Sequence, residues 1–439
     1  MKHLSERTVI TGLMGFQFVA LLLIAFLTLN YFRLQHLTDL KLYYNFSLSL
    51  MQGQFPYRDF PLEYPPLALL PIVLPQLFNP FGFRGYVVLF FVENALFCIL
   101  VAWVLWRIAS SLRFRHRSMQ VLVSYVLLVI VSAPLLPWRY DLFPALLTLL
   151  ALLSVVAGHP VLVGDQRSFK RLYTRETGFP RTLQNQFSGL LVGLWLGLGI
   201  AAKLYPVVLL PIFSLYYLVK REYLTLLRVI LGTFVTTGLI LLPFALVGSE
   251  RFLSFLKYHQ HRGLQLESLS SGLILLINKL GGTEVQLINN YGAAHLISPL
   301  ADNVLKWLPF TFLFMFGVVI FSCFNCFRRE QARLGTVTTE SLVAYVTVTL
   351  LIFIATNKVF SPQYIIWLLP FAPLLRLRQI GLFIVICIAT FLIFPFFYWK
   401  LIDLDLDLIL LLNLRNILLV TLMFWLLGER SIASAEKKG

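Results

Sequence analysis

The chain has 439 residues, of which 59% are hydrophobic and 13% charged, and its formal net charge is +16. This composition excludes an ordinary water-soluble domain and predicts one integral-membrane domain over residues 1–439. The basic residues lie in short clusters between apolar runs and not in a stripe interleaved with aromatic residues, so no nucleic-acid partner is expected.

The apolar runs predict an all-α, polytopic transmembrane bundle of about 12 spans, because a membrane helix needs ~20 largely apolar residues. The first run, Val9–Leu29, is too long for a signal-peptide core and is expected to remain as an anchor. The predicted spans cover residues 9–30, 85–107, 119–136, 140–157, 187–202, 204–219, 224–247, 303–327, 339–356, 362–375, 379–398 and 407–427.

Basic clusters between the spans predict the orientation, because loops on the cytoplasmic side carry an excess of Lys and Arg. With both termini and residues 158–186 in the cytoplasm, 22 Lys/Arg and 8 Asp/Glu lie on that side, against 13 and 11 outside. The two long outer loops are then residues 31–84 and 248–302. We expect an integral plasma-membrane protein, most simply of a bacterial inner membrane.

Each long outer loop contains an apolar stretch that is too short to cross a membrane. Leu67–Phe78 is bounded and interrupted by prolines, and Leu273–Leu280 has only eight residues. We predict that both form interfacial or re-entrant helices on the outer side, where irregular backbone needs protein or water around it.

Unusual polar residues gather on the predicted outer side. Asp39 follows the first span, and the loop continues through Arg58, Asp59, Glu63 and Tyr64 to a Pro-Pro pair. Independent interfacial anchors are expected on both membrane surfaces, so clusters on one surface indicate a site. The remaining candidates for substrate binding are Arg139, Asp141, Lys203, Tyr205, His259, Arg262, Lys358 and Gln363.

Each of these residues also has an ordinary structural explanation. Asp141 can cap a helix, Lys203 and Lys358 can extend from helix ends toward water, and Arg58 can pair locally with Asp59 or Glu63. His259, His261 and Glu267 lack a complete ligand set at metal-binding spacing, so we predict no metal site. The four cysteines lie in or beside apolar runs and give no disulfide framework.

The chemistry of the outer face suits a substrate that carries a phosphate. A carboxylate can act as a base, while Arg and Lys hold an anion. The candidate cations are Arg139, Lys203, Arg262 and Lys358, and the tyrosines that can line a sugar pocket are Tyr57, Tyr64, Tyr205 and Tyr364. Soluble nucleotides are absent outside the cytoplasm, so a phosphate-bearing substrate there is expected on a lipid.

Glu93-Asn94 lies inside the second predicted span. A carboxylate in a membrane is costly unless it is neutral, paired or next to a cavity, which makes it a functional candidate. A hydrogen bond between helices is the structural alternative.

The order of the outer motifs resembles the GT-C superfamily of integral-membrane glycosyltransferases, and most closely glycosyltransferase family 87, which includes polyprenyl-phosphate-mannose-dependent α-mannosyltransferases. The motifs that carry the resemblance are Asp39, Tyr43-Tyr44, Gly53-x-x-Pro56-Tyr57, Tyr64-Pro65-Pro66-Leu67, Arg139-Tyr140-Asp141, Lys203-x-Tyr205-Pro206 and Asn357-Lys358-x-Phe360-Ser361-Pro362-Gln363-Tyr364.

The resemblance implies an inverting transfer of a hexose, with mannose as the expected sugar, from a polyprenyl-phosphate donor to a hydroxyl of a lipid-linked or glycan acceptor. Asp39 matches the catalytic aspartate of the family and is the expected general base. No cofactor is implied beyond the lipid-phosphate sugar as co-substrate. Asp39-Leu40-Lys41 lacks the second acid of a DxD-like pattern, so a divalent metal is not supported.

Two other functions remain open from the sequence. A secondary transporter would suit twelve spans and an intramembrane Glu93, but transporters usually place ionisable residues near the midplane and in related halves. A lipid-linked glycan ligase or flippase would also use a phosphate site on the outer face. The Asp39 to Tyr64-Pro65-Pro66 pattern favours the glycosyltransferase.

Overall fold

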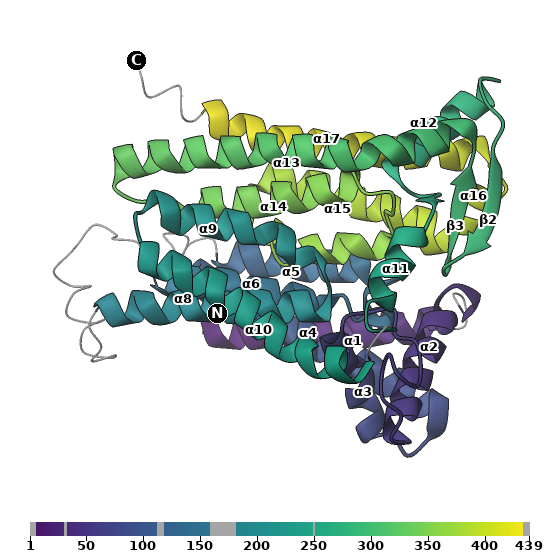
Figure 1. The fold of residues 1–439 in the computed structure, drawn as a ribbon, viewed down its shortest axis with the longest axis horizontal. Coiled ribbons are helices and arrows are strands. Elements are labelled where there is room, and N and C mark those ends of the chain that lie inside the picture. The colour runs from purple at the N-terminus through teal and green to yellow at the C-terminus, as the bar shows by residue number, and fades with distance from the viewer. Residues whose placement is uncertain (1–5, 30–32, 112–117, 159–180, 249–250, 433–439) are drawn as a thin grey trace, which may run out of the picture.

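The computed structural model describes residues 6–29, 33–111, 118–158, 181–248 and 251–432. Long helices lie side by side along its longest axis (Figure 1), and successive helices run back and forth between two ends. One end carries a small β-sheet and short helices, and we call it the sheet end. The opposite end carries the turns of the long helices, and we call it the basic end.

The predicted polytopic, all-α fold is confirmed. Six helices among the described residues are long and apolar enough to cross a membrane. Eleven of the predicted spans correspond to α1 (Glu6–Leu29), α4 (Gly82–Ser111), α5 (Ser118–Ser132), α6 (Leu142–Gly158), α8 (Arg181–Ala202), α9 (Leu210–Val219) after the 3₁₀-helix η4 (Tyr205–Leu209), α10 (Tyr223–Gly248), α13 (Pro299–Leu334), α14 (Thr339–Ala355), α15 (Leu377–Phe391) and α17 (Leu406–Ile432).

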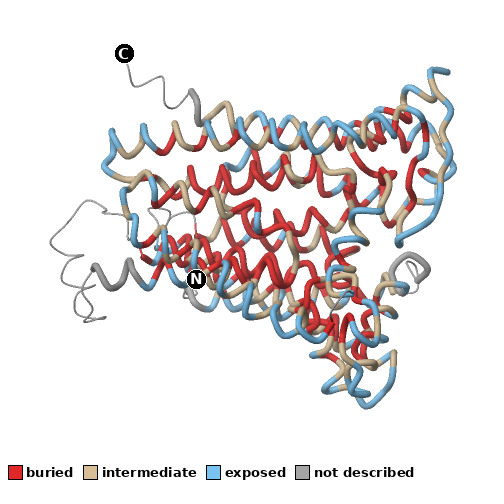
Figure 2. The backbone as a smooth tube through the Cα atoms, viewed as in Figure 1, coloured by how far each residue is buried: buried red, intermediate tan, exposed pale blue. Residues whose placement is uncertain are grey.

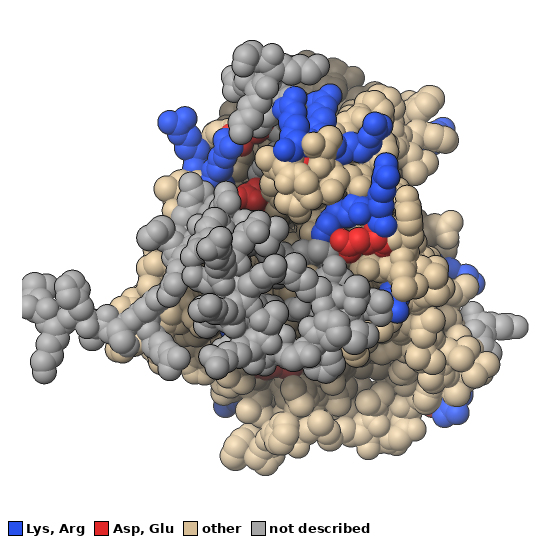
Figure 3. Space-filling view, turned by 90° about the vertical axis from the view of Figure 1, so that its left-hand side faces the viewer, with Lys and Arg blue, Asp and Glu red and all other residues tan. Residues whose placement is uncertain are grey.

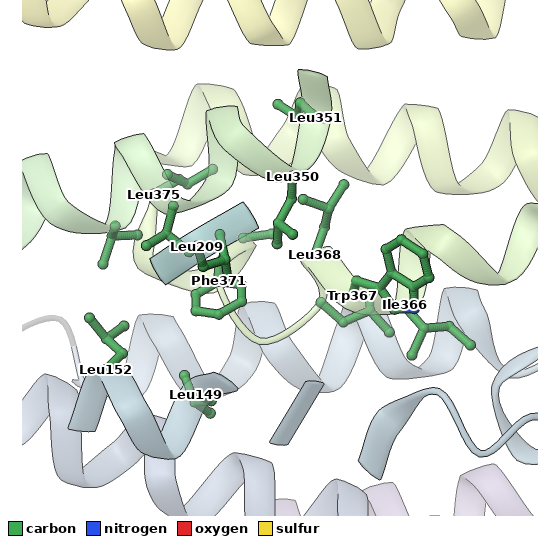
Figure 4. Close-up of a cluster of buried hydrophobic side chains, with 14 of the residues drawn as sticks. Leu149, Leu152, Leu209, Leu350, Leu351, Ile366, Trp367, Leu368, Phe371 and Leu375 are labelled. Atoms are coloured by element: carbon green, nitrogen blue, oxygen red, sulfur yellow. The ribbon is translucent and has the colours of Figure 1, made fainter. Parts of the chain in front are cut away.

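The tenth predicted span, residues 362–375, is not an α-helix. It consists of two 3₁₀-helices, η6 (Pro362–Leu368) and η7 (Ala372–Leu374), and prolines at 362, 370 and 373 remove the backbone donors that an α-helix would use. A 3₁₀-helix rises ~2.0 Å per residue, so this segment covers more length per residue than an α-helix would. Its side chains are buried among other helices (Figure 4), which is where a membrane protein tolerates irregular backbone.

The main apolar core surrounds this 3₁₀ segment. Trp367 and Phe371 pack with leucines of α6 and α14, including Leu149 and Leu350 (Figure 4). The buried residues concentrate in the middle of the molecule (Figure 2), whereas α10 and α13 expose large apolar side chains such as Phe234. Outward-facing apolar side chains on peripheral helices are what a lipid-facing surface requires, in agreement with an integral membrane protein.

α8 and α10 pack through glycines that let the two backbones approach. A Cβ atom added at Gly193 would lie 2.7 Å from the Val229 carbonyl oxygen and 2.9 Å from the Gly232 Cα. Gly189 and Gly197 contact α10 in the same way at Thr225 and at 233–236. This spacing of four residues is the small-residue pattern by which membrane helices approach closely.

The sheet end is built from shorter elements. They are α2 (Arg33–Met51), η1 (Pro66–Ala68), α3 (Leu69–Leu77), η3 (Leu136–Trp138), α11 (Ser254–His261), α12 (Leu269–Lys279), α16 (Tyr398–Ile402) and the strands β1 (Leu264–Gln265), β2 (Gln286–Asn290) and β3 (Ala293–Ile297). The strands form one antiparallel sheet in the order β1-β3-β2. α3 and α12 occupy the two stretches predicted to form interfacial helices, whereas the sheet was not predicted.

Asp39 lies on a helix and not in an irregular loop. α2 buries Leu40, Tyr43, Phe46 and Ser47, which recur at helical spacing along one face. The low apolar content of this segment therefore reflects a helix packed on the sheet end with its other face exposed.

Lys and Arg side chains gather at the basic end (Figure 3), with fewer acidic residues among them. The described basic residues in the turns and helix ends there are Lys220, Arg221, Arg328, Arg329, Arg333, Arg376 and Arg378. Of the predicted cytoplasmic loop 158–186, residues 159–180 lie outside the described part of the chain.

Gly193→Ala is expected to destabilise the protein by ~1–3 kcal/mol, because the added methyl group overlaps the α10 backbone. The matched control is Gly238→Ala on α10, where an added Cβ has no atom within 4 Å. That variant should gain up to ~1 kcal/mol from helix propensity. Thermal unfolding in detergent measures both, and equal midpoints for the two variants would contradict the packing argument.

Candidate active site

A cavity of about 1630 Å³ opens at the sheet end, and we call it the polar cavity. Segments that are far apart in the sequence line it: α2, the loop before α3, the segment before α6, the end of α8, α11, the β2–β3 hairpin and residues 357–367. The predicted site residues in its lining are Asp39, Glu63, Tyr64, Arg139, Lys203, Tyr205, His259, Arg262, Lys358 and Gln363. The structure thus brings ten of the thirteen predicted residues to one cavity.

Asp39 is held by Arg139. Arg139 Nη2 lies 2.5 Å from Asp39 Oδ2, and Arg139 Nε donates to Gln363 Oε1 at 2.8 Å. The Arg139 side chain is only 6% exposed, whereas that of Asp39 is 35% exposed. The second carboxylate oxygen, Oδ1, has no hydrogen-bond partner among the described residues. Asp39 therefore lines the polar cavity with a carboxylate that Arg139 contacts through Oδ2.

Asp141 does not line the polar cavity but lies fully buried behind it. Its Oδ1 accepts from Lys203 Nζ at 2.5 Å and from Trp367 Nε1 at 2.7 Å. The ammonium also lies 4.9 Å from the centroid of the Tyr140 ring. Asp141 thus neutralises and positions Lys203, and the helix-capping explanation is not needed.

Arg262 and Lys358 are cations without a carboxylate partner. Within the described part of the chain neither forms an ion pair, and Lys358 Nζ donates only to the Gln260 carbonyl, at 2.7 Å. The buried Nε of Arg262 has no hydrogen-bond partner among those residues. Burial, and then the charge of Arg262, lowers the pKa of Lys358. This part of the cavity therefore carries uncompensated positive charge.

His259 lies beside these cations and is neutral at pH 7. Burial, followed by the charges of Arg262, Lys203 and Lys358, lowers its pKa to about 4. A neutral imidazole offers one donor and one acceptor to a ligand.

Glu63 faces the polar cavity and does not pair with Arg58. Burial raises the pKa of Glu63. The Tyr258 hydroxyl, which also lines the cavity, donates to the Tyr291 carbonyl at 2.7 Å. A carboxyl group in this position can bind or orient a hydroxyl-bearing ligand.

Arg58 and Asp59 do not line the polar cavity. They pair with each other on the surface at 2.8 Å, and hydrogen bonds from Arg58 and from the Phe55 backbone lower the pKa of Asp59 to about 2. Tyr57, a predicted pocket residue, is buried outside the lining, and its hydroxyl donates to the Tyr64 carbonyl. These three residues shape the loop that carries Glu63 and Tyr64.

Aromatic rings form one wall of the polar cavity. Trp367 stacks between Tyr205 and Tyr364, with ring centroids 4.1 and 3.9 Å apart. Tyr64 meets Tyr43 edge to face at 6.1 Å. Stacked rings beside polar groups suit the apolar and polar faces of a sugar.

Several lining residues were not among the predicted site residues. Gln265 and Glu267 on and after β1, Tyr398, and the hairpin turn at Tyr291-Gly292 all contribute to the lining. Burial raises the pKa of Glu267 to about 7. The sequence Leu264-Gln265-Leu266-Glu267 alternates apolar and polar residues, which is the pattern of a half-buried strand and a usable signal.

Among the described residues, no group of three or more His, Cys, Asp or Glu side chains is placed to hold a metal ion. Glu93 and Asn94 do not line the polar cavity. Asn94 Nδ2 bonds to the Phe90 carbonyl at 3.0 Å and to the Pro137 carbonyl at 3.5 Å, so it links α4 to η3 as a structural hydrogen bond. Glu93 is buried, and neither carboxylate oxygen has a partner in the described regions.

Comparison with known proteins gives one family match. Residues 62–362, more than half of the chain, match the model of Glycosyltransferase family 87. Two crystal structures of ArnT from Cupriavidus metallidurans are similar at 14% identity: the complex with undecaprenyl phosphate (TM-score 0.44, covering 84% of this chain and 68% of that chain) and the apo state (TM-score 0.41, 84% and 67%). No curated protein matches the sequence.

Proposed function

Since the chain belongs to glycosyltransferase family 87, we propose that it transfers a hexose, with mannose as the expected sugar, from a polyprenyl-phosphate donor to a hydroxyl of a lipid-linked or glycan acceptor. One observation carries the proposal: a single cavity holds an exposed, oriented carboxylate, Asp39, together with two cations that lack ion-pair partners, Arg262 and Lys358. The carboxylate can act as the base, and the two cations can bind the phosphate leaving group.

In the proposed reaction, Asp39 Oδ1 takes the proton of the acceptor hydroxyl as its oxygen attacks the anomeric carbon. The bond from that carbon to the phosphate oxygen breaks, and polyprenyl phosphate leaves with the electron pair. Attack opposite the leaving group inverts the anomeric configuration. Arg139 keeps Asp39 oriented, and Gln363 keeps Arg139 in place.

The leaving phosphate is assigned to Arg262 and Lys358 in preference to Arg139 and Lys203. The latter two already pair with Asp39 and Asp141, whereas the first two have donors to spare. A negative charge in a partly desolvated cavity is stabilised best by cations that are fixed before it forms. The proposal includes no metal ion and no organic cofactor.

Membership of a glycosyltransferase family disfavours the transporter and the ligase or flippase that the sequence left open. Glu93, which suited a transporter, lies outside the polar cavity lining. We therefore argue the glycosyltransferase function alone.

We further propose that the sheet end faces the outside of a bacterial plasma membrane, with both termini in the cytoplasm. Support comes from the basic residues gathered at the opposite end (Figure 3). A donor carried on a lipid is reached from that side without soluble nucleotides.

Asp39→Asn and Asp39→Ala are expected to lower sugar transfer by ~10²–10⁴-fold, the usual contribution of a general base. The assay is transfer from defined polyprenyl-phosphate hexoses by protein reconstituted in liposomes, with and without EDTA. Asp59→Asn, which removes a surface carboxylate outside the cavity, should stay close to wild type. Turnover retained by folded Asp39 variants would overturn the base assignment.

Arg262→Met and Lys358→Met should each raise the KM for the donor by about 10-fold or more, since a hydrogen bond to a charged group contributes ~1.5–3 kcal/mol. The KM for the acceptor should change little. Arg58→Met is the matched control, because Arg58 is exposed and paired with Asp59. If instead the Arg139 or Lys203 variants alone changed donor KM, the phosphate would have to be placed elsewhere.

Orientation can be tested with cysteines, because the four native cysteines are buried. Glu284→Cys at the sheet end should react with a membrane-impermeant maleimide in intact cells. Arg333→Cys at the basic end should react only after permeabilisation. Both positions are exposed, and the reverse labelling pattern would contradict the orientation.

A further inference from the structure

Gln265 and Glu267 present buried, unpaired oxygen atoms to the polar cavity. Each residue is 2% exposed, and both line the cavity. Gln265 Oε1 and Glu267 Oε2 have no hydrogen-bond partner among the described residues. Since buried polar atoms are almost always paired, two unpaired oxygens on adjacent same-side residues indicate the position of a ligand.

The backbone of this segment is held firmly. Gln265 N donates to the Lys358 carbonyl at 2.9 Å, and its carbonyl accepts from Ser271 Oγ at 2.7 Å. Arg415 Nη2 donates to the Glu267 carbonyl at 2.7 Å. The peptide groups are therefore satisfied by protein, while the two side-chain oxygens are not.

Gln265 ends β1, and Glu267 lies in the turn that follows, where Ser268 N donates to the Gln265 carbonyl at 3.0 Å. Leu264 and Leu266 are fully buried in the apolar cluster beneath the sheet, together with Leu296 of β3. Gln265 and Glu267 instead line the polar cavity.

The free atoms determine the chemistry of the ligand. The amide oxygen Gln265 Oε1 and the carboxylate oxygen Glu267 Oε2 are the unpaired atoms, and both kinds of oxygen accept hydrogen bonds. The ligand must therefore bring hydrogen-bond donors, either hydroxyl or ammonium groups.

Arg262, one of the cations assigned to the donor phosphate, lines the same cavity, so the subsite and the phosphate position share one cavity.

We propose that Gln265 and Glu267 form the subsite that accepts hydrogen bonds from hydroxyls of the donor sugar. The inference rests on the proposed function and deepens it by naming the residues that select the donor.

The test uses polyprenyl phosphates carrying mannose, glucose and the monodeoxy analogues of mannose, with reconstituted full-length protein. Wild type should discriminate against one or two deoxy analogues by about 10²-fold, because each of these leaves a buried acceptor unpaired. For mannose and its analogues, the quantity compared is kcat/KM.

Glu267→Gln and Gln265→Met should lower kcat/KM for the preferred hexose and reduce discrimination against the matching deoxy analogue to within a few-fold. Glu284→Gln, which alters an exposed carboxylate in the same loop, should leave discrimination unchanged. Unchanged discrimination in both subsite variants overturns the assignment. Thermal unfolding establishes that each variant folds.

Failure of the proposed function has a separate signature. If wild type transfers no sugar from any of these donors and none of them raises its thermal unfolding midpoint, both the donor class and the subsite are wrong. If transfer occurs but the Gln265 and Glu267 variants discriminate as wild type does, only the subsite is wrong.

Discussion

The cost of burying charge is the constraint on which the polar cavity depends. Asp141 has no exposed surface and is matched by Lys203 and the Trp367 indole, while the buried Arg139 is matched by Asp39 and Gln363. A buried charge without such partners costs several kcal/mol. These pairs therefore hold the wall of the cavity in place. Charged groups in such pairs are structural, whereas charged groups without a partner can bind a ligand. Arg262 and Lys358 are partly exposed and have no ion-pair partner among the described residues, and the buried Glu267 has one unpaired carboxylate oxygen.

Much of the membrane architecture is predictable from the sequence, because apolar length and basic clusters act over whole segments. Short helices near 67–78 and 273–280 follow from the limited apolar length of these stretches, and prolines bound the first of them. Residues 362–375 mislead the same reasoning, since apolar content says that a segment is buried but not which helix it forms. The helix type depends on the three prolines and on packing against the surrounding helices. The prolines can be read from the sequence, but the packing cannot.

The candidate site is predictable as a set of motifs but not as a set of contacts. The shared face of Asp39, Arg139, Lys203 and Lys358 follows from topology. Asp141 and its cation Lys203 are separated by 62 positions, and Asp39 and Arg139 by 100, and no local pattern encodes such pairings. The apolar–polar alternation at β1 is local and can be read from the sequence. The strand has only two residues, however, and is recognised as a strand only from its pairing with β3.

The Asp39–Arg139 pair has a consequence for regiochemistry in the proposed reaction. With Oδ2 occupied by a guanidinium that Gln363 holds from behind, only Oδ1 remains for an incoming hydroxyl. An acceptor with several hydroxyl groups would then be restricted to those able to approach from one direction. Gln363, which belongs to the 3₁₀-helix η6, would therefore influence which linkage forms. It would do so through Arg139 and would not need to touch the acceptor.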